Sequence, residues 1–142
     1  MLTTIAKATE NFCIHQIREP HTINTTVSKK RTLIAYIDID AQDGTKHRVY
    51  IASDEAFMQR VSYLFLEEDE SDEETLIDMT LETANLIIGS AKVIAEDLDE
   101  NPYTINTPYF VKMGTFDLEY DMAQTISVNN DEITIAIKEL HD

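Results

Sequence analysis

The sequence predicts an α+β fold in which an antiparallel-rich sheet packs against one long helix. Several short segments alternate apolar and polar residues, which is typical of strands with one buried face. One longer segment, ending at about Asp97, repeats its apolar residues at intervals of three and four, as an amphipathic helix does. The expected order is helix, three strands, two helices and about three strands, with the long helix against the sheet.

Length and composition limit the classes of protein that this chain belongs to. The 142 residues fit a single domain spanning 1–142. Hydrophobic residues make up 43% of the chain and charged residues 27%, which is typical of a soluble globular protein. The net charge of −16 disfavours binding to nucleic acid or anionic lipid, because such binding relies on cationic side chains. A partner that presents basic residues is favoured instead, although simple solubility also accounts for the charge.

The sequence also bears on the compartment. It has no apolar run long enough to cross a membrane and no signal-peptide pattern at its start. The one cysteine, Cys13, has no partner for an internal disulfide, and we expect a buried structural thiol. These features predict a cytoplasmic protein. The four histidines are scattered without ligand spacing, so no metal site is expected.

The first half of the chain changes from a helical to an alternating pattern. Residues 3–17 carry apolar side chains at helical spacing, which predicts an opening helix. Alternation begins at about residue 21, and Asp43-Gly44 supplies a tight turn before a strand at about 46–52. One strand face is expected to hold Leu33, Ala35, Ile37 and Ile39.

Capping signals predict where the next two helices begin. Ser53 is the expected N-cap of a short helix over 54–66. In the following stretch, 67–74, every residue except Ser71 is acidic, and either a solvated loop or a steering element for a basic partner fits this composition. Ser71 and Glu74 match the S-x-x-E capping box, which predicts the start of the long helix.

Strands are expected again after the long helix. Two prolines divide the chain into extended segments near 103–112. Alternation predicts strands over 116–122 and 124–128, and Asn129-Asn130 is the expected turn. The last strand contains Ile133, Ile135 and Ile137.

On a helical wheel, the long helix is expected to be mostly buried. An apolar seam recurs along one side, and Leu86, Val93 and Met79 extend the apolar character around the far side. What remains is one narrow polar strip. The seam consists of Ile77, Leu81, Ala84, Ile88, Ala91, Ala95 and Leu98, and the strip of Asp78, Glu82, Asn85, Gly89, Lys92 and Glu96.

Glu82 and Asn85 are the candidate functional residues. They lie three residues apart and therefore project together from neighbouring turns of the strip. Gly89, one turn further, costs about 1 kcal/mol relative to alanine in a helix interior, and close approach of another backbone would explain it. A merely solvated polar face is the alternative, but such a face is usually wider and richer in Lys and Glu.

The segment around these residues resembles a known family. Residues 78–89, D-M-T-L-E-T-A-N-L-I-I-G, are similar to the D/S-x-x-x-E-x-x-N-x-x-x-G signature of the CheC/CheX/FliY phosphatases. These bacterial chemotaxis proteins remove phosphate from the response regulator CheY. The order of the short helix, acidic loop, long helix and N-T-P-Y-F stretch (106–110) is also similar. A single E-x-x-N copy, with Ile88 where some CheC motifs have a second asparagine, favours the CheX branch.

The resemblance implies a division of roles. Glu82 would pair with a lysine of phosphorylated CheY and fix the docking geometry, and Asn85 would orient a water in line with the phosphorus. Asp78 would support the site, by capping or positioning, and Gly89 would let the loops of CheY approach. Mg²⁺ would come with the regulator, so the chain itself would need no cofactor.

Two questions stay open at this stage. A non-catalytic docking module of the same fold, binding a chemotaxis or flagellar switch protein, is the alternative to a phosphatase. The resemblance also leaves the oligomeric state open between monomer and homodimer, because CheX-like proteins can dimerise by joining their sheets.

Overall fold

The structure is a computed structural model that describes residues 2–12, 21–41, 43–67, 70–97 and 103–140. The elements follow the predicted α+β order, with four strands after the long helix in the described residues where about three were expected. They are α1 (Leu2–Phe12), β1 (Thr22–Asn24), β2 (Arg31–Ala41), β3 (Lys46–Asp54), α2 (Glu55–Leu66), α3 (Glu73–Asp97), β4 (Tyr103–Ile105), β5 (Tyr109–Thr115), β6 (Met122–Val128) and β7 (Asp131–Leu140).

The described strands form one antiparallel sheet, as the sequence predicts. Its order is β1-β6-β7-β3-β2-β4, and β5 also pairs with β2. Two tight turns set the register of the hairpins. Gly44 has a φ of +90° between β2 and β3. Asn129 and Asn130 both have positive φ between β6 and β7, which is the backbone that a two-residue hairpin requires.

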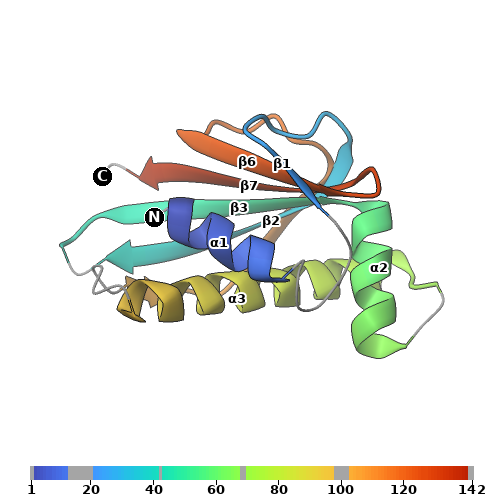
Figure 1. The fold of residues 1–142 in the computed structure, drawn as a ribbon, viewed down its shortest axis with the longest axis horizontal. Coiled ribbons are helices and arrows are strands. Elements are labelled where there is room, and N and C mark those ends of the chain that lie inside the picture. Colours follow the sequence, from blue (N-terminus) through green and yellow to red (C-terminus); the bar gives the residue numbers. More distant parts are fainter. Residues whose placement is uncertain (1, 13–20, 42, 68–69, 98–102, 141–142) are drawn as a thin grey trace.

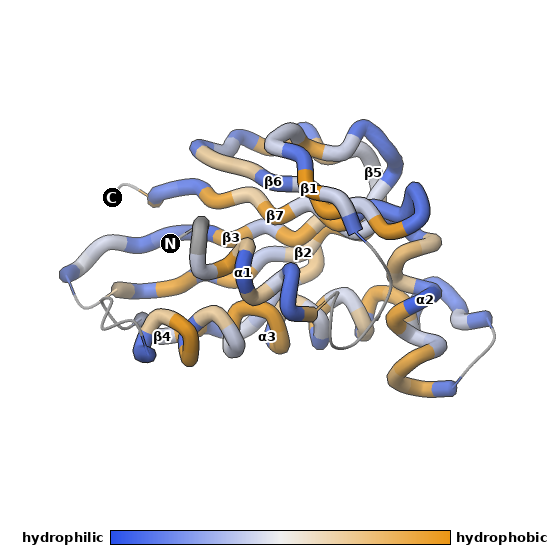
Figure 2. Tube along the Cα trace, in the orientation of Figure 1, coloured by the Kyte–Doolittle hydropathy of each residue, from blue (hydrophilic) through white to orange (hydrophobic). Residues whose placement is uncertain are grey.

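The main hydrophobic core lies between the sheet and the helices. Figure 1 shows α1 and α3 on one side of the sheet, with α2 at one end. The inward face of β2 is the predicted one, since Leu33, Ile37 and Ile39 are fully buried in this core. In Figure 2 hydrophobic residues recur along α3 and the central strands, whereas the turn between β2 and β3 is hydrophilic. The core therefore fixes which side of α3 faces inward.

The opposite face of the sheet carries a second, smaller core that the sequence patterns did not predict. Residues 116–121 form no strand, although alternation predicted one over 116–122. Phe116 instead packs on the outer face of β3, with its ring 5.5 Å from that of Tyr50. Alternating apolar residues in a loop that covers a sheet give the same pattern as a strand, which explains the wrong prediction.

Two helix starts differ from the capping predictions. Asp54, and not Ser53, is the N-cap of α2, and its Oδ1 accepts a hydrogen bond from the backbone N–H of Phe57 at 2.6 Å. For α3, the Oδ1 of Asp72 accepts from the N–H of Thr75 at 2.8 Å, so the expected capping box of Ser71 and Glu74 is wrong.

The predicted opening helix over 3–17 is confirmed as far as the described residues reach. Its described part is Leu2–Phe12, and residues 13–20, including Cys13, lie outside the described residues. Its buried Ile5, Ala8 and Phe12 belong to the main core, as their helical spacing suggested.

Candidate active site

Tertiary packing fixes the rotation of α3 about its axis. The side of the helix that faces α1, α2 and the sheet is buried. Most of the predicted seam lies on this side, although Ile77 and Leu81 are half-buried and Leu98 is outside the described residues. The buried side chains are Leu76, Met79, Thr80, Thr83, Ala84, Ile87, Ile88, Ala91 and Ala95.

Two threonines on the buried side of α3 have partners for their hydroxyl groups. Thr80 Oγ1 donates to the carbonyl oxygen of Leu76 at 2.8 Å, and Thr83 Oγ1 lies 3.8 Å from the Sδ of Met58 on α2. Both threonines are fully buried, and neither was recognised from the sequence as part of the core. Because their hydroxyl groups have partners, these threonines are compatible with a buried position.

Glu82 and Asn85 lie together on the exposed side of α3, as predicted. Their separation of three residues corresponds to a rise of about 4.5 Å along the axis. Asp78 is also exposed, one turn before Glu82. It lies five residues beyond the first residue of α3, so it does not cap the helix, and only the partner-facing part of its predicted role remains as a hypothesis.

The surroundings of these side chains leave them accessible to another molecule. Within the described part of the chain, the side chains of Glu82 and Asn85 make no hydrogen bond or ion pair. Gly89 is half-buried, and a Cβ built there would have no atom within 4 Å. No contact within the described chain therefore explains this glycine, and the space above it is open to a partner.

The charge of α3 favours a cationic group near Glu82. The helix contains six acidic residues and one lysine, Lys92, which gives a net charge of 1 − 6 = −5. Because opposite charges attract over a Debye length of about 10 Å or less at ordinary salt, a cation on a docking partner is stabilised on this face.

The exposed face is wider than the narrow strip that the sequence predicted. Leu86 is 40% exposed and Val93 55% exposed, although both were expected to be buried, whereas Met79 is buried. The helix wheel identifies apolar positions but not which neighbours cover them. Leu86 lines an open groove opposite α1 and is only partly covered, so the polar strip has an apolar border.

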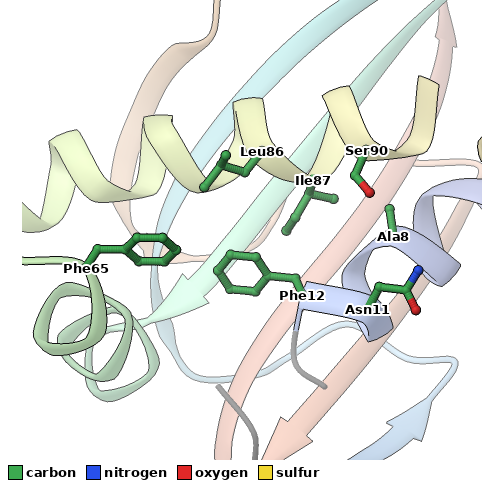
Figure 3. A pocket seen from close by; sticks show the side chains of 7 residues that line it. All are labelled: Ala8, Asn11, Phe12, Phe65, Leu86, Ile87 and Ser90. Carbon is green, nitrogen blue, oxygen red and sulfur yellow. The ribbon is translucent and has the colours of Figure 1, made fainter. Parts of the chain in front are cut away.

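An apolar groove opens beside that border. It lies between α1 and α3, has a volume of about 290 Å³, and ends near α2. Figure 3 shows the rings of Phe12 and Phe65 facing each other below Leu86, and their centroids are 6.2 Å apart. The lining residues are Ala8, Asn11, Phe12, Phe65, Leu86, Ile87 and Ser90.

With this geometry in view, comparison with known proteins identifies the family. Residues 34–135, more than half of the chain, match the family model described as chemotaxis phosphatase CheX. The chain belongs to the CheX family. None of the curated protein sequences matches it at a significant level.

Solved structures place the CheX fold across the whole chain. The chemotaxis protein CheX from Vibrio vulnificus is similar with a TM-score of 0.82 and 16% identity, over 97% of this chain and 95% of that one. CheX from Desulfovibrio desulfuricans has a TM-score of 0.73 and 17% identity, over 97% of each chain. The CheX-CheY-BeF₃-Mg²⁺ complex from Borrelia burgdorferi has a TM-score of 0.71 and 14% identity, over 96% of this chain and 97% of that one. Because the sequence identities are between 14% and 17%, the similarity to these structures establishes the fold alone.

No helix in the described part of this CheX-family chain is long and apolar enough to cross a membrane. Cys13, His15 and His141 lie outside the described residues, so the expected structural thiol and the expected lack of a metal site stay predictions.

Proposed function

We propose that this protein is a phosphatase that hydrolyses the aspartyl phosphate of a CheY-type response regulator in chemotaxis. The observation that carries the proposal is the pair Glu82 and Asn85, which a CheX-family fold exposes side by side on α3 with no partner among the described residues. The Borrelia complex supports the choice of partner, because there a protein of this fold is bound to CheY with BeF₃ and Mg²⁺.

The chemistry requires little from this chain. An acyl phosphate is already activated, so hydrolysis needs a water held in line with the phosphorus and no nucleophile from the phosphatase. Holding the water in a near-attack geometry contributes up to about 7–11 kcal/mol in ideal cases. The Asn85 amide both donates and accepts hydrogen bonds, so it is able to orient one water, as a glutamine does in GTPases.

Docking is the role that we assign to Glu82. A carboxylate pairs with a lysine of the regulator, and the pair sets the position of Asn85 at the phosphoryl group. The negative charge of α3 adds to this attraction. Mg²⁺ belongs to the phosphorylated regulator, which is the substrate, and this chain is proposed to bind no cofactor of its own. The reaction takes place in the cytoplasm, where we also place the protein.

Two variants and a control test the assignment of roles. The protein is mixed with phosphorylated CheY and Mg²⁺, and release of phosphate is followed at several CheY concentrations. We expect Asn85→Ala to lower kcat about 100-fold or more while binding is retained, because the water loses its orientation. Glu82→Ala is expected to raise KM about tenfold, because the docking charge is lost.

Glu96→Ala is the matched control. Glu96 is an exposed glutamate on the same strip, about 21 Å from Glu82 along the axis, so its loss should leave both kcat and KM near the wild-type values. If the wild-type protein binds phosphorylated CheY but leaves its decay unchanged, the phosphatase is refuted and the non-catalytic docking module is correct. The same samples, examined by sedimentation, distinguish monomer from homodimer.

A further inference from the structure

The groove between α1 and α3 is not used by the roles assigned to Glu82 and Asn85. Its two ends differ in chemistry. Phe12, Phe65 and Leu86 form an apolar end, whereas Asn11 and Ser90 place an amide and a hydroxyl at the other (Figure 3). None of the lining residues is charged. Such a lining accepts an uncharged side chain and offers hydrogen-bonding groups to a neighbouring backbone.

The groove is continuous with the candidate active site. Leu86 follows Glu82 by four residues and Asn85 by one, so it borders the strip and also forms a wall of the groove. Ser90 follows Gly89 directly, where the surface has no side chain to separate the strip from the groove. A molecule docked over Asn85 and Gly89 therefore reaches the groove without crossing a raised surface.

Charge indicates which kind of group enters. The groove borders a helix of net charge −5, which disfavours an anionic occupant such as a phosphate or a carboxylate. An apolar side chain next to a cationic one satisfies both features, since the cation pairs with Glu82 while the apolar group is removed from water against Leu86 and Phe65.

We propose that this groove is a second docking point for the phosphorylated regulator, and that it receives an apolar side chain adjacent to the cation that pairs with Glu82. The proposal rests on the proposed function for the identity of the partner. In this proposal Leu86 and Ser90 recognise the regulator, whereas Glu82 and Asn85 dock it and orient the water. Apolar anchors in pockets at the centre of an interface commonly carry much of its binding energy.

Two groove variants and a matched control test the proposal. Leu86→Ala removes a wall, and Ser90→Phe fills the groove from a surface position. Both are expected to raise KM for phosphorylated CheY about five- to tenfold at unchanged kcat. Leu64→Ala is the control, because Leu64 is 42% exposed, close to the 40% of Leu86, and does not line the groove. Its KM should equal that of the wild type.

A binding measurement separates the two proposals. Affinity for CheY carrying BeF₃ and Mg²⁺ is measured by titration calorimetry for the same variants, with thermal unfolding to establish that each is folded. One outcome is that the wild type binds without catalysis while the groove variants bind about five- to tenfold more weakly. In that case the proposed phosphatase activity is refuted and the groove proposal is supported. If Leu86→Ala and Ser90→Phe match the wild type in affinity and KM, or if the wild type does not bind CheY, the groove proposal is wrong.

Discussion

At the scale of single residues, Gly89 connects stability with function. It lies in the interior of α3, where glycine is less favourable than alanine by about 1 kcal/mol. A Cβ at this position would have no atom within 4 Å, so nothing in the described chain requires the glycine. We expect Gly89→Ala to stabilise the protein by about 0.5–1 kcal/mol in urea unfolding and, if a regulator docks here, to raise KM.

A neighbouring substitution provides the control for Gly89. Val93→Ala also improves helix propensity on the same exposed side, but it removes atoms from the surface instead of adding them. It should leave KM unchanged. If Gly89→Ala proves both more stable and fully active, docking does not approach this turn of α3.

Residue-scale patterns predicted the exposed pair but not the two N-caps. Glu82 and Asn85 could be placed together because a spacing of three on a helix determines their neighbourhood. At each helix start the adjacent aspartate is the N-cap, and the predicted serine is engaged in other contacts. Ser53 is buried in β3, paired with Leu33, and Ser71 is hydrogen-bonded to α2 through Ser62. The sequence near each helix start contains no information about these contacts.

At the scale of elements, the N-terminus of α3 should respond to pH through Asp72. Two hydrogen bonds from Thr75 lower the pKa of the Asp72 carboxyl below its ordinary value. The bond from the backbone N–H has the larger effect, and the bond from the side chain has the smaller one. A carboxyl with a lower pKa in the folded state stabilises that state above its unfolded pKa of about 4, and this contribution is lost as the pH falls through the folded value. We therefore expect Asp72→Ala to lower Tm at neutral pH, and the difference to disappear in acid.

Asp72→Asn separates the cap from its charge. Asparagine caps helices about as well as aspartate, so this variant should keep most of the Tm at neutral pH but show less dependence on pH between about pH 5 and pH 2. A Tm difference for Asp72→Ala that stays constant down to about pH 2 would contradict the role of ionisation.

Element-scale periodicity predicted which elements exist but not what covers them. The alternation over 116–122 is real, yet Phe116 buries itself on the outer face of the sheet from a loop. Likewise, Leu86 and Val93 are apolar but exposed, because no neighbouring element of the described chain covers them fully. A single sequence indicates the period of an element, whereas its neighbours come from long-range packing. For this reason the sequence does not predict the groove, although Leu86 is recognisable as an apolar position.

At the scale of the whole molecule, acidic charge is concentrated in the region that contains the site. Residues 55–97 contain twelve acidic and two cationic residues, so they contribute 2 − 12 = −10 to the net charge of −16. Much of the compensation lies on the sheet, for example where Arg48 makes two hydrogen bonds to Asp38 at 2.8 and 3.0 Å. This carboxylate raises the pKa of the guanidinium above its ordinary range. The uncompensated charge of the helices attracts a cationic partner but also repels itself.

Self-repulsion predicts how salt affects stability. We expect Tm to rise between about 20 and 500 mM NaCl, because the Debye length shortens from roughly 20 Å to a few ångströms and screens the repulsion. Screening also weakens ion pairs such as Arg48–Asp38, but exposed pairs contribute only about 0–1 kcal/mol each. The triple variant Glu70→Gln, Glu96→Gln and Asp97→Asn, which removes two acids from the negative end of α3, should have a higher Tm at low salt and a smaller rise. A wild-type Tm that falls with salt would mean that the ion pairs on the sheet outweigh the repulsion among the helices.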